Sequence, residues 1–358
     1  MDGVLLRVLH VINDLESDGG AQRIVRDLVA LHSGRVEPSV LTLYPVSPEV
    51  LSEFHALGVR HAALKTVPPR AGEVSRFLHQ YDVAHVHLFP SLYLSTLISG
   101  PKLFTEHNTW NRRMETETFR SVERFVYRRY DRVVCISEAT ERALLRWLGP
   151  GGPPTTVIPN GIRLDRFRGE VRPLPEEHVT FVMVARFVPQ KDQATVIRAL
   201  ARLPERARLV LVGDGPLRSH AEELARSLGV EGRIRFLPPV PADEMPGLLR
   251  NADIYVQSSH WEGFGLVAVE AMASGLPVVA SRVPGLSEVV GPSMPQFDPG
   301  DDSGLARLAE HLLSPDVYAD LSRTALERSR RFGAEAMADA YLETYQQLHL
   351  ESGRGTTN

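Results

Sequence analysis

Two series of short apolar runs, separated by amphipathic stretches of helical length, constrain the fold more than any other feature of this chain. The first series comprises Leu5–Ile12, Ser39–Leu43, Val83–His87, Leu103–Thr105, Val133–Ile136 and Thr156–Ile158. The second comprises Thr180–Ala185, Arg208–Val212, Ile234–Leu237, Asp253–Gln257 and Pro277–Ala280. Such alternation is typical of βα units on a parallel sheet. The sequence therefore predicts an α/β protein with two doubly wound, Rossmann-like domains that face a cleft.

The segment between the two series, Arg163–Pro175, is rich in charge and proline and has no apolar period, so we predict a linker there. The expected domains are then residues 1–163 and 176–333. Residues 334–358 are expected to form a last helix and a tail, because apolar side chains recur on one helical face up to residue 348. The interdomain cleft is the natural place for a functional site.

Composition and charge exclude several classes of protein. The single cysteine, Cys135, cannot form an internal disulfide or a thiolate metal cluster. The formal net charge is −4 and the chain has no basic-aromatic module, so a nucleic-acid partner is not expected. Asp2 stands where a signal peptide would carry Lys or Arg, so secretion is not expected. The uncharged stretch 83–101 contains His85 and His87, which argues against a membrane span.

Two cations follow the first strand predicted in the second half. Of the 40 basic residues, only Lys65, Lys102 and Lys191 are lysines, and Lys191 stands five residues after Arg186. Carboxyl ends of parallel strands face the crevice of an open α/β sheet. One planar and one compact cation there could bind a phosphate group. Two solvated loop charges are the alternative.

Two acids, Glu262 and Glu270, flank the start of a predicted helix. Glu270 interrupts the otherwise apolar stretch Phe264–Ala273. Burying a carboxylate there is unfavourable unless it is paired or hydrogen-bonded. Glu270 could accept two vicinal hydroxyls from a ribose, with an internal salt bridge as the alternative. Glu262, at the helix start, could hold sugar hydroxyls.

Glycines follow two of the predicted strands. Gly19 and Gly20 come after the first strand and before a helical stretch, where backbone N–H groups can approach an anion. A simple turn explains this pair equally well. The segment Gly213–Gly215 is interpreted as a tight strand-to-helix turn. A dinucleotide fold would need Gly-x-Gly-x-x-Gly directly after the first strand. That fingerprint is absent, so a nicotinamide-dependent dehydrogenase is not expected.

Taken together, these motifs resemble the retaining glycosyltransferases of family four, which have the GT-B fold. The resemblance runs in family order from Val8 to about Leu348. It is carried by Gly19-Gly20-Ala21, Asp82–His87, Thr105-Glu106-His107, Ser137-Glu138, Ile158–Gly161, Arg186 with Lys191-Asp192, Gly213-Asp214-Gly215, and Glu262 with Glu270.

The resemblance implies how the two domains divide their work. The nucleotide-sugar donor is expected on the C-terminal domain, the acceptor on the N-terminal domain, and the last helix is expected to return to the N-terminal domain. Catalytic residues implied by the resemblance are Arg186, Lys191, His107 and Glu262. Donor-binding residues implied are Gly19, Gly20, Leu237, Phe264, Gly265, Leu266 and Glu270. His107 could instead be a packed histidine.

In this family Arg186 and Lys191 would bind the donor diphosphate and stabilise its charge as the glycosidic bond breaks. The chain contains no Asp-x-Asp, so we expect no metal and no cofactor. The resemblance implies retention and a UDP-sugar donor rather than a GDP-sugar. The segment Phe236–Val240, which is expected to contact the base, has a proline where relatives commonly have glycine, so uridine and guanosine both stay open.

The acceptor is the least constrained feature. Cell-surface polysaccharide, lipopolysaccharide or another glycoconjugate is expected, with a sugar-nucleotide epimerase or a small-metabolite glycosyltransferase on the same fold as the alternative. A non-catalytic binding module would not need the whole set of charged residues. The basic segment Arg112–Arg132 is interpreted as a solvated helix with intrahelical ion pairs rather than a membrane-binding surface. The expected location is cytoplasmic, with contact at the inner membrane face less favoured.

Overall fold

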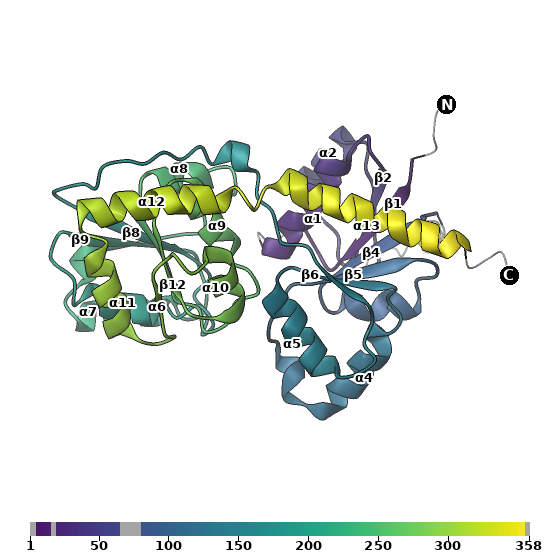
Figure 1. Cartoon of the computed structure of the whole chain (residues 1–358), viewed down its shortest axis with the longest axis horizontal. Coiled ribbons are helices and arrows are strands. Elements are labelled where there is room, and N and C mark those ends of the chain that lie inside the picture. The colour runs from purple at the N-terminus through teal and green to yellow at the C-terminus, as the bar shows by residue number, and fades with distance from the viewer. Residues whose placement is uncertain (1–4, 16–18, 65–79, 355–358) are drawn as a thin grey trace. The chain divides into compact units, whose positions relative to one another are not determined.

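The computed structural model describes residues 5–15, 19–64 and 80–354, which form two α/β units (Figure 1). Unit 1 contains residues 1–161 and 334–358, and unit 2 contains residues 162–333. Both units carry a parallel sheet with flanking helices, so the predicted fold class is confirmed.

The sheet of unit 1 has the strand order β3-β2-β1-β4-β5-β6-β7. Its strands are β1 (Arg7–Ile12), β2 (Glu37–Thr42), β3 (Arg60–Ala63), β4 (Val83–His87), β5 (Lys102–Glu106), β6 (Arg132–Cys135) and β7 (Thr155–Val157). Its helices are α1 (Gly20–His32), α2 (Pro48–Ala56), α4 (Glu117–Tyr127), α5 (Glu138–Leu148) and α13 (Ala334–Arg354), with short 3-10 turns η1 (Ser91–Thr96) and η2 (Arg112–Glu115). The strand order reverses between β1 and β4.

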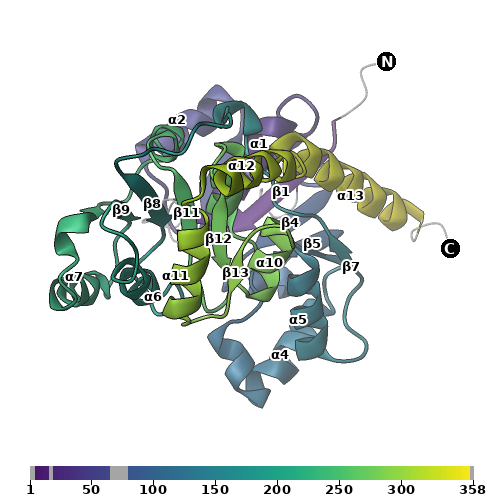
Figure 2. The same ribbon diagram turned by 60° about the vertical axis from the view of Figure 1, so that its left-hand side comes forward.

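The sheet of unit 2 has the order β10-β9-β8-β11-β12-β13, and Figure 2 shows its central strands side by side. Its strands are β8 (Val179–Val184), β9 (Ala207–Val212), β10 (Ile234–Leu237), β11 (Ile254–Gln257), β12 (Val278–Ser281) and β13 (Gln296–Phe297). Its helices are α6 (Gln193–Leu200), α7 (Arg218–Ser227), α8 (Met245–Arg250), α9 (Leu266–Ala273), α10 (Pro284–Val290), α11 (Asp302–His311) and α12 (Pro315–Ser329), with 3-10 turns η3 (Leu164–Arg166) and η4 (Glu231–Arg233). Here the order reverses between β8 and β11.

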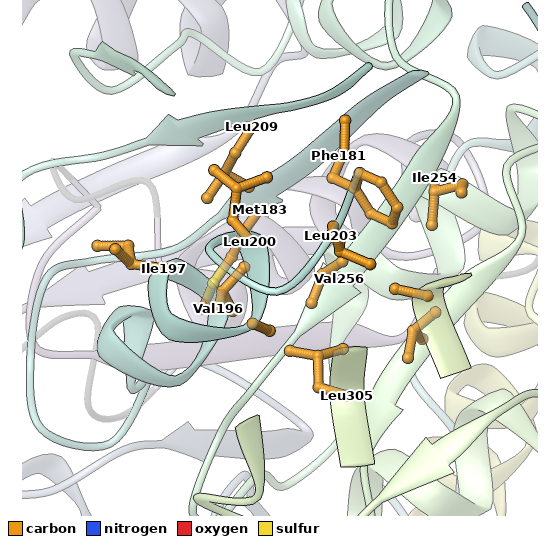
Figure 3. Close-up of a cluster of buried hydrophobic side chains, with 14 of the residues drawn as sticks. Phe181, Met183, Val196, Ile197, Leu200, Leu203, Leu209, Ile254, Val256 and Leu305 are labelled. Carbon is orange, nitrogen blue, oxygen red and sulfur yellow. The ribbon is translucent and has the colours of Figure 1, made fainter. Parts of the chain in front are cut away.

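The core of unit 2 explains why its apolar runs became strands. Side chains from β8, β9, β11, α6 and α11 form one buried cluster (Figure 3). Phe181 and Met183 alternate along β8 toward this cluster, and Ile197 and Leu200 contribute from one side of α6. Burial of such side chains contributes about 1.5–3 kcal/mol each. The hydrophobic effect therefore fixes the register of the strands that carry the loops discussed below.

Residues 163–175, expected as a linker, pack along unit 2 instead. The Gly169 amide donates to the Ala273 carbonyl at 3.0 Å, and Arg172 Nη2 donates to the Ala252 carbonyl at 2.7 Å. A Cβ at Gly169 would lie 2.1 Å from the Ser274 carbonyl carbon, so the segment crosses the end of α9 in direct contact. The sequence has no apolar periodicity here, and hydrogen bonds from arginine side chains to backbone carbonyls hold the segment against unit 2 instead.

The last helix belongs to unit 1. Helix α13 contacts α1 and β4, and its Met337, Tyr341, Tyr345 and Leu348 are buried. The apolar face read from the sequence is therefore a packing face within unit 1. Among the described residues, no helix combines the length and the apolar content needed to cross a bilayer.

Candidate functional site

The loops that follow β8 and β11 carry the cations and acids singled out in the sequence. Strands β8 and β11 pair in parallel, while β9 lies on the other side of β8 and β12 on the other side of β11. Connections from β8 and β11 therefore run in opposite directions across the sheet. Ligands of open α/β sheets bind in the crevice outside the carboxyl ends of strands at such a reversal.

The loop after β8 is held by a close approach of two backbones. The Phe187 amide donates to the Asp214 carbonyl at 2.8 Å, and the Phe187 side chain is fully buried. A Cβ at Gly213 would lie 2.2 Å from the Ala185 carbonyl oxygen, and one at Gly215 would lie 2.5 Å from the Phe187 carbonyl oxygen. Both glycines have positive φ. The segment Gly213–Gly215 is thus a tight turn. Because its two glycines have no side chain, the loop after β8 can pack directly against its backbone.

Arg186 and Lys191 have different surroundings on this loop. The Arg186 side chain is exposed and makes no ion pair with the described residues. Lys191 Nζ forms an ion pair with Glu262 Oε2, and both side chains are largely buried, at 18% and 14% exposure. Lys191 and Glu262 were each predicted from the sequence as site residues, but the sequence did not indicate that their side chains would form an ion pair.

Glu262 lies in a polar pocket of its own unit. Its Oε2 also accepts hydrogen bonds from Gln257 Nε2 at 2.9 Å and from Ser259 Oγ at 3.3 Å. Gln190 Nε2 donates to the Trp261 carbonyl at 2.8 Å, which ties the loop after β8 to the loop after β11. The two loops therefore form one hydrogen-bonded structure around the carboxylate.

Helix α9 begins at a narrow junction. Its N-cap Gly265 has φ 95°, and a Cβ there would lie 2.8 Å from Leu286 Cδ1. The Phe264 side chain is buried and packs edge-on against Phe332, with ring centroids 5.5 Å apart. Phe264 can therefore offer a ligand only its backbone. The first two helical amides, those of Leu266 and Val267, precede the first intrahelical acceptor, whereas the Ala268 amide already donates to the Gly265 carbonyl at 3.0 Å.

Glu270 is fully buried in α9. Burial, followed by the charges of Glu262 and Glu270, raises the pKa of the Tyr255 phenol well above its ordinary value. Both acids of the motif thus raise the pKa of one buried hydroxyl, that of Tyr255.

Leu237 ends β10, and its carbonyl accepts from the Gly213 amide at 3.1 Å and from Arg218 Nη1 at 3.0 Å.

In unit 1 the corresponding reversal lies between β1 and β4. Gly19 is the N-cap of α1 and Gly20 its first residue, so the predicted helix start is present. Asn13, which sequence reasoning missed, ties the loops after β1 and β4 together: its Oδ1 accepts from the Ser91 amide at 3.2 Å and from Ser91 Oγ at 2.7 Å.

His107 follows β5 at the same edge of the sheet. Its ring centroid lies 6.0 Å from that of His87, and burial lowers the pKa of His107 to about 4. The ring is therefore neutral at pH 7. Glu106 accepts a hydrogen bond from the Asn108 amide at 3.0 Å and another from the Tyr127 hydroxyl, which holds the start of the His107 loop.

A buried histidine cluster is the feature that sequence reasoning missed most clearly. His10, His85 and His87 are fully buried, and in the described part of the chain theirs is the one group of His, Cys, Asp or Glu side chains close enough to share a metal, with ligand atoms within 4.8 Å. Both nitrogens of His85 are already engaged, by Tyr345 Oη at 2.7 Å and Thr105 Oγ1 at 2.7 Å. The alternation of histidines along β4 was the available signal.

The basic segment around α4 carries few of the ion pairs expected of it. Among the described residues of α4, the intrahelical pair is Arg120 with Glu117, at 3.2 Å. Arg128 Nε instead donates to the Gly151 carbonyl at 2.9 Å, and Arg129 lies 4.4 Å from the centre of the Phe125 ring. The helix is amphipathic with aromatic side chains on its exposed side, so solvation by ion pairs describes it only in part.

Two parallel α/β units with the strand order 3-2-1-4-5-6, extended by a seventh strand in unit 1, each with polar loops at the order reversal, define the GT-B class of proteins. A model of the glycosyl transferases group 1 matches residues 167–331, and a model of glycosyltransferase family 4 matches residues 18–166. The chain belongs to the family-four glycosyltransferases.

Similar curated proteins carry two kinds of name. The chain is 35% identical over 251 residues to a D-inositol 3-phosphate glycosyltransferase of Saccharomonospora viridis, covering 63% of this chain and 57% of that protein. It is 29% identical over 290 residues to a glycogen synthase of Mycobacterium tuberculosis, covering 76% and 70%. The chain thus spans a little over half the length of the inositol phosphate relatives it matches.

Solved structures share the fold over nearly the whole chain. Anabaena Alr3699/HepE in complex with UDP and glucose has a TM-score of 0.81 at 23% identity, covering 96% of this chain and 100% of that one. Sucrose-phosphate synthase of Thermosynechococcus elongatus has a TM-score of 0.82 at 25% identity, covering 97% and 100%. These likenesses confirm the predicted GT-B fold.

Proposed function

We propose that this protein transfers a sugar from a nucleoside diphosphate donor to a hydroxyl acceptor, with retention of configuration and without a metal ion. The observation that carries the proposal is the meeting of two loops at the strand reversal of unit 2. One loop carries Arg186 and Lys191, and the other carries Glu262. Family membership supports the same reaction class.

The proposed chemistry assigns the charge of the leaving group to the two cations. As the bond between the anomeric carbon and the phosphate oxygen breaks, its electron pair stays on that oxygen, and Arg186 and Lys191 stabilise the charge. The acceptor hydroxyl forms the new bond on the same face of the sugar and passes its proton to the departing oxygen. Glu262 holds sugar hydroxyls and Glu270 holds ribose hydroxyls. The remaining proposed donor contacts are Leu237 and the backbone of Phe264–Leu266.

For unit 1 we propose a role in binding the acceptor. His107, neutral at pH 7, can accept or donate one hydrogen bond at each ring nitrogen. Gly19 and Gly20 remain proposed donor contacts, because the start of α1 offers backbone N–H groups to an anion such as the donor diphosphate.

For the donor we propose a UDP-sugar in preference to a GDP-sugar. The complexes of Anabaena HepE with UDP, and with UDP and glucose, support this choice. For the acceptor, cell-surface glycans are the first candidate. The names of the inositol phosphate relatives favour a small phosphorylated polyol as the second.

The experiment is a panel of UDP- and GDP-sugars, each incubated with the protein in EDTA. We expect slow hydrolysis of one donor, and sugar transfer when a glycan or polyol phosphate acceptor is added, with the anomeric configuration of the product assigned by NMR. Hydrolysis that requires a divalent ion would contradict the proposed metal independence. A product of inverted configuration would contradict the proposed retention. An epimerised nucleotide-sugar from donor alone would indicate an epimerase instead.

A cytoplasmic location, with or without contact at the inner membrane face, is part of the same proposal. Fractionation of cells that express the chain tests it, and we expect the protein with the cytoplasmic fraction.

A further inference from the structure

Gln257 is a buried polar residue that the proposed chemistry leaves without a role. It is the last residue of β11, and its side chain is 4% exposed behind three buried residues, Ile254, Tyr255 and Val256. An amide has hydrogen-bonding groups at both ends, and burying either end without a partner is unfavourable. The partners of Gln257 therefore indicate why an amide stands there.

Both ends of the amide are engaged, and its neighbours fix its orientation. Gln257 Oε1 accepts from Tyr255 Oη at 3.1 Å, and Gln257 Nε2 donates to Glu262 Oε2 at 2.9 Å. A carboxylate only accepts, so the amino end must face Glu262. A hydrogen-bonded row thus runs from Tyr255 through Gln257 to Glu262 and ends at Lys191.

Three donors converge on one carboxylate oxygen. Lys191 Nζ, Gln257 Nε2 and Ser259 Oγ all bond Glu262 Oε2, and Ser259 is fully buried. The charge of Lys191 is therefore already paired within unit 2. A diphosphate that binds the Lys191 ammonium competes with Glu262 for its charge and draws Nζ away from the carboxylate. A largely buried carboxylate that loses its cation is left at a high cost unless other donors hold it.

We infer that Gln257 is a positioning residue that keeps Glu262 hydrogen-bonded when Lys191 turns to the donor diphosphate, and so favours donor binding. Ser259 supports the same oxygen as a second, longer hydrogen bond. The inference rests on the proposed function, because it assumes that a diphosphate binds Lys191.

Two near-isosteric variants separate the parts of this role. Gln257→Met removes the side-chain hydrogen bonds to Tyr255, Ser259 and Glu262. Gln257→Glu keeps the oxygen that accepts from Tyr255 but sets a second carboxylate against Glu262, so Lys191 is held more strongly. The matched control is Gln296→Met in the same unit: Gln296 accepts from Ser287 Oγ at 2.7 Å and donates to the Gly291 carbonyl at 2.9 Å, away from Glu262.

The test is calorimetric titration of each full-length variant with UDP and with GDP, beside a thermal melt. For the nucleotide that the wild type binds, we expect a Kd about tenfold higher in Gln257→Met, which corresponds to about 1.4 kcal/mol. We expect a further increase in Gln257→Glu and no change in Gln296→Met. If Gln257→Met does not fold, Ser259→Ala replaces it, with an expected increase of about threefold, since it removes the longer bond.

A double-variant cycle distinguishes positioning from a purely structural role. In a Lys191→Met background, Gln257→Met should leave the Kd unchanged, because no cation has to be exchanged. Equal loss of affinity in both backgrounds, or a lower melting temperature with unchanged Kd, overturns the inference and leaves the proposed function standing. If the wild type binds neither nucleotide, the proposed function fails as well.

Discussion

At the scale of single residues, the two cations after β8 play unequal parts in holding unit 2 together. Lys191 is paired with Glu262 in a largely buried position, and its removal would leave a carboxylate without its cation. Arg186 is exposed on the same loop. A change in activity at Arg186 can therefore be attributed to the ligand, whereas a change at Lys191 mixes ligand binding with local stability.

Arg186→Ala should lower kcat about 10²–10³-fold with an unchanged melting temperature, because Arg186 is exposed and, in the proposed function, its charge stabilises the leaving group. Steady-state kinetics with the donor found in the panel checks this. The matched control is Arg198→Ala, an exposed arginine on α6 of the same unit, which should retain wild-type kcat. Near-normal turnover in Arg186→Ala would remove its assigned role.

Gly213 tests the close approach that shapes the loop. Gly213→Ala should lower the free energy of unfolding of unit 2 by about 3 kcal/mol, because its φ of 139° is strained for alanine and its Cβ would meet the Ala185 carbonyl. Denaturant titration followed by a unit 2 signal measures it. Gly232→Ala, with nothing within 4 Å of the new Cβ, should change the value little. An equal loss of unfolding free energy at Gly213 and Gly232 would show that the close approach at Gly213 does not stabilise the loop.

At the scale of elements, polar contacts rather than apolar packing alone join α13 to the sheet of unit 1. Tyr345 Oη bonds His85 Nδ1 at 2.7 Å, Thr105 Oγ1 bonds both His85 Nε2 at 2.7 Å and Tyr341 Oη at 3.0 Å, and His32 bonds the Ala338 carbonyl at 2.8 Å. These groups are buried, so each bond that is lost leaves an unsatisfied partner.

Tyr345→Phe should therefore lower the free energy of unfolding of unit 1 by about 1–3 kcal/mol, the typical cost of leaving a buried nitrogen unpaired. Amide hydrogen exchange along α13 should rise at the same time. Leu350→Ala, at an exposed position of the same helix, is the control and should leave exchange unchanged. Unchanged exchange in Tyr345→Phe would show that the hydroxyl does not hold the helix.

At the scale of the whole molecule, most of the architecture could be predicted because its signal is periodic. Parallel strands buried on both faces appear as apolar runs, and most of these were identified. Strands β3, Arg60–Ala63, and β13, Gln296–Phe297, were missed because each is short and partly polar. The segment 163–175 was interpreted as a linker because arginine-to-carbonyl bonds leave no apolar pattern.

Candidate site residues could be singled out from the sequence where a residue type is unusual for its setting, as Glu270 is within an apolar helix. Pairings between distant residues were not. Lys191 and Glu262 are 71 positions apart, and only the adjacency of β8 and β11 brings them together. The hydrogen bonds of Gln257 and Asn13 could not be predicted for the same reason. A single polar residue at a strand end gives no signal before the strand order is known.

Acid should destabilise unit 1 more than unit 2. Burial lowers the pKa of His10 to about 3 and of His107 to about 4, and lowers those of His32, His85 and His87. Below the ordinary pKa of 6.5 the unfolded chain binds more protons than the folded unit. Each histidine therefore removes up to about 1.4 kcal/mol of stability per pH unit, down to its folded pKa.

Hydrogen exchange at pH 7.5, 6.5 and 5.5, corrected for intrinsic rates, checks this prediction unit by unit. Protection of the strands of unit 1 should fall with pH while that of unit 2 changes less. His178→Gln, at an exposed histidine of unit 2, should leave the pH dependence unchanged. A flat profile for unit 1 between pH 7.5 and 5.5 would contradict the neutral, buried state of the cluster.

A crystal structure of the protein with a bound nucleotide-sugar shows whether the loops after β8 and β11 hold that ligand. We expect diphosphate oxygens within hydrogen-bond distance of the Arg186 guanidinium and Lys191 Nζ, with ribose hydroxyls at Glu270. A diphosphate bound away from these loops would contradict this expectation.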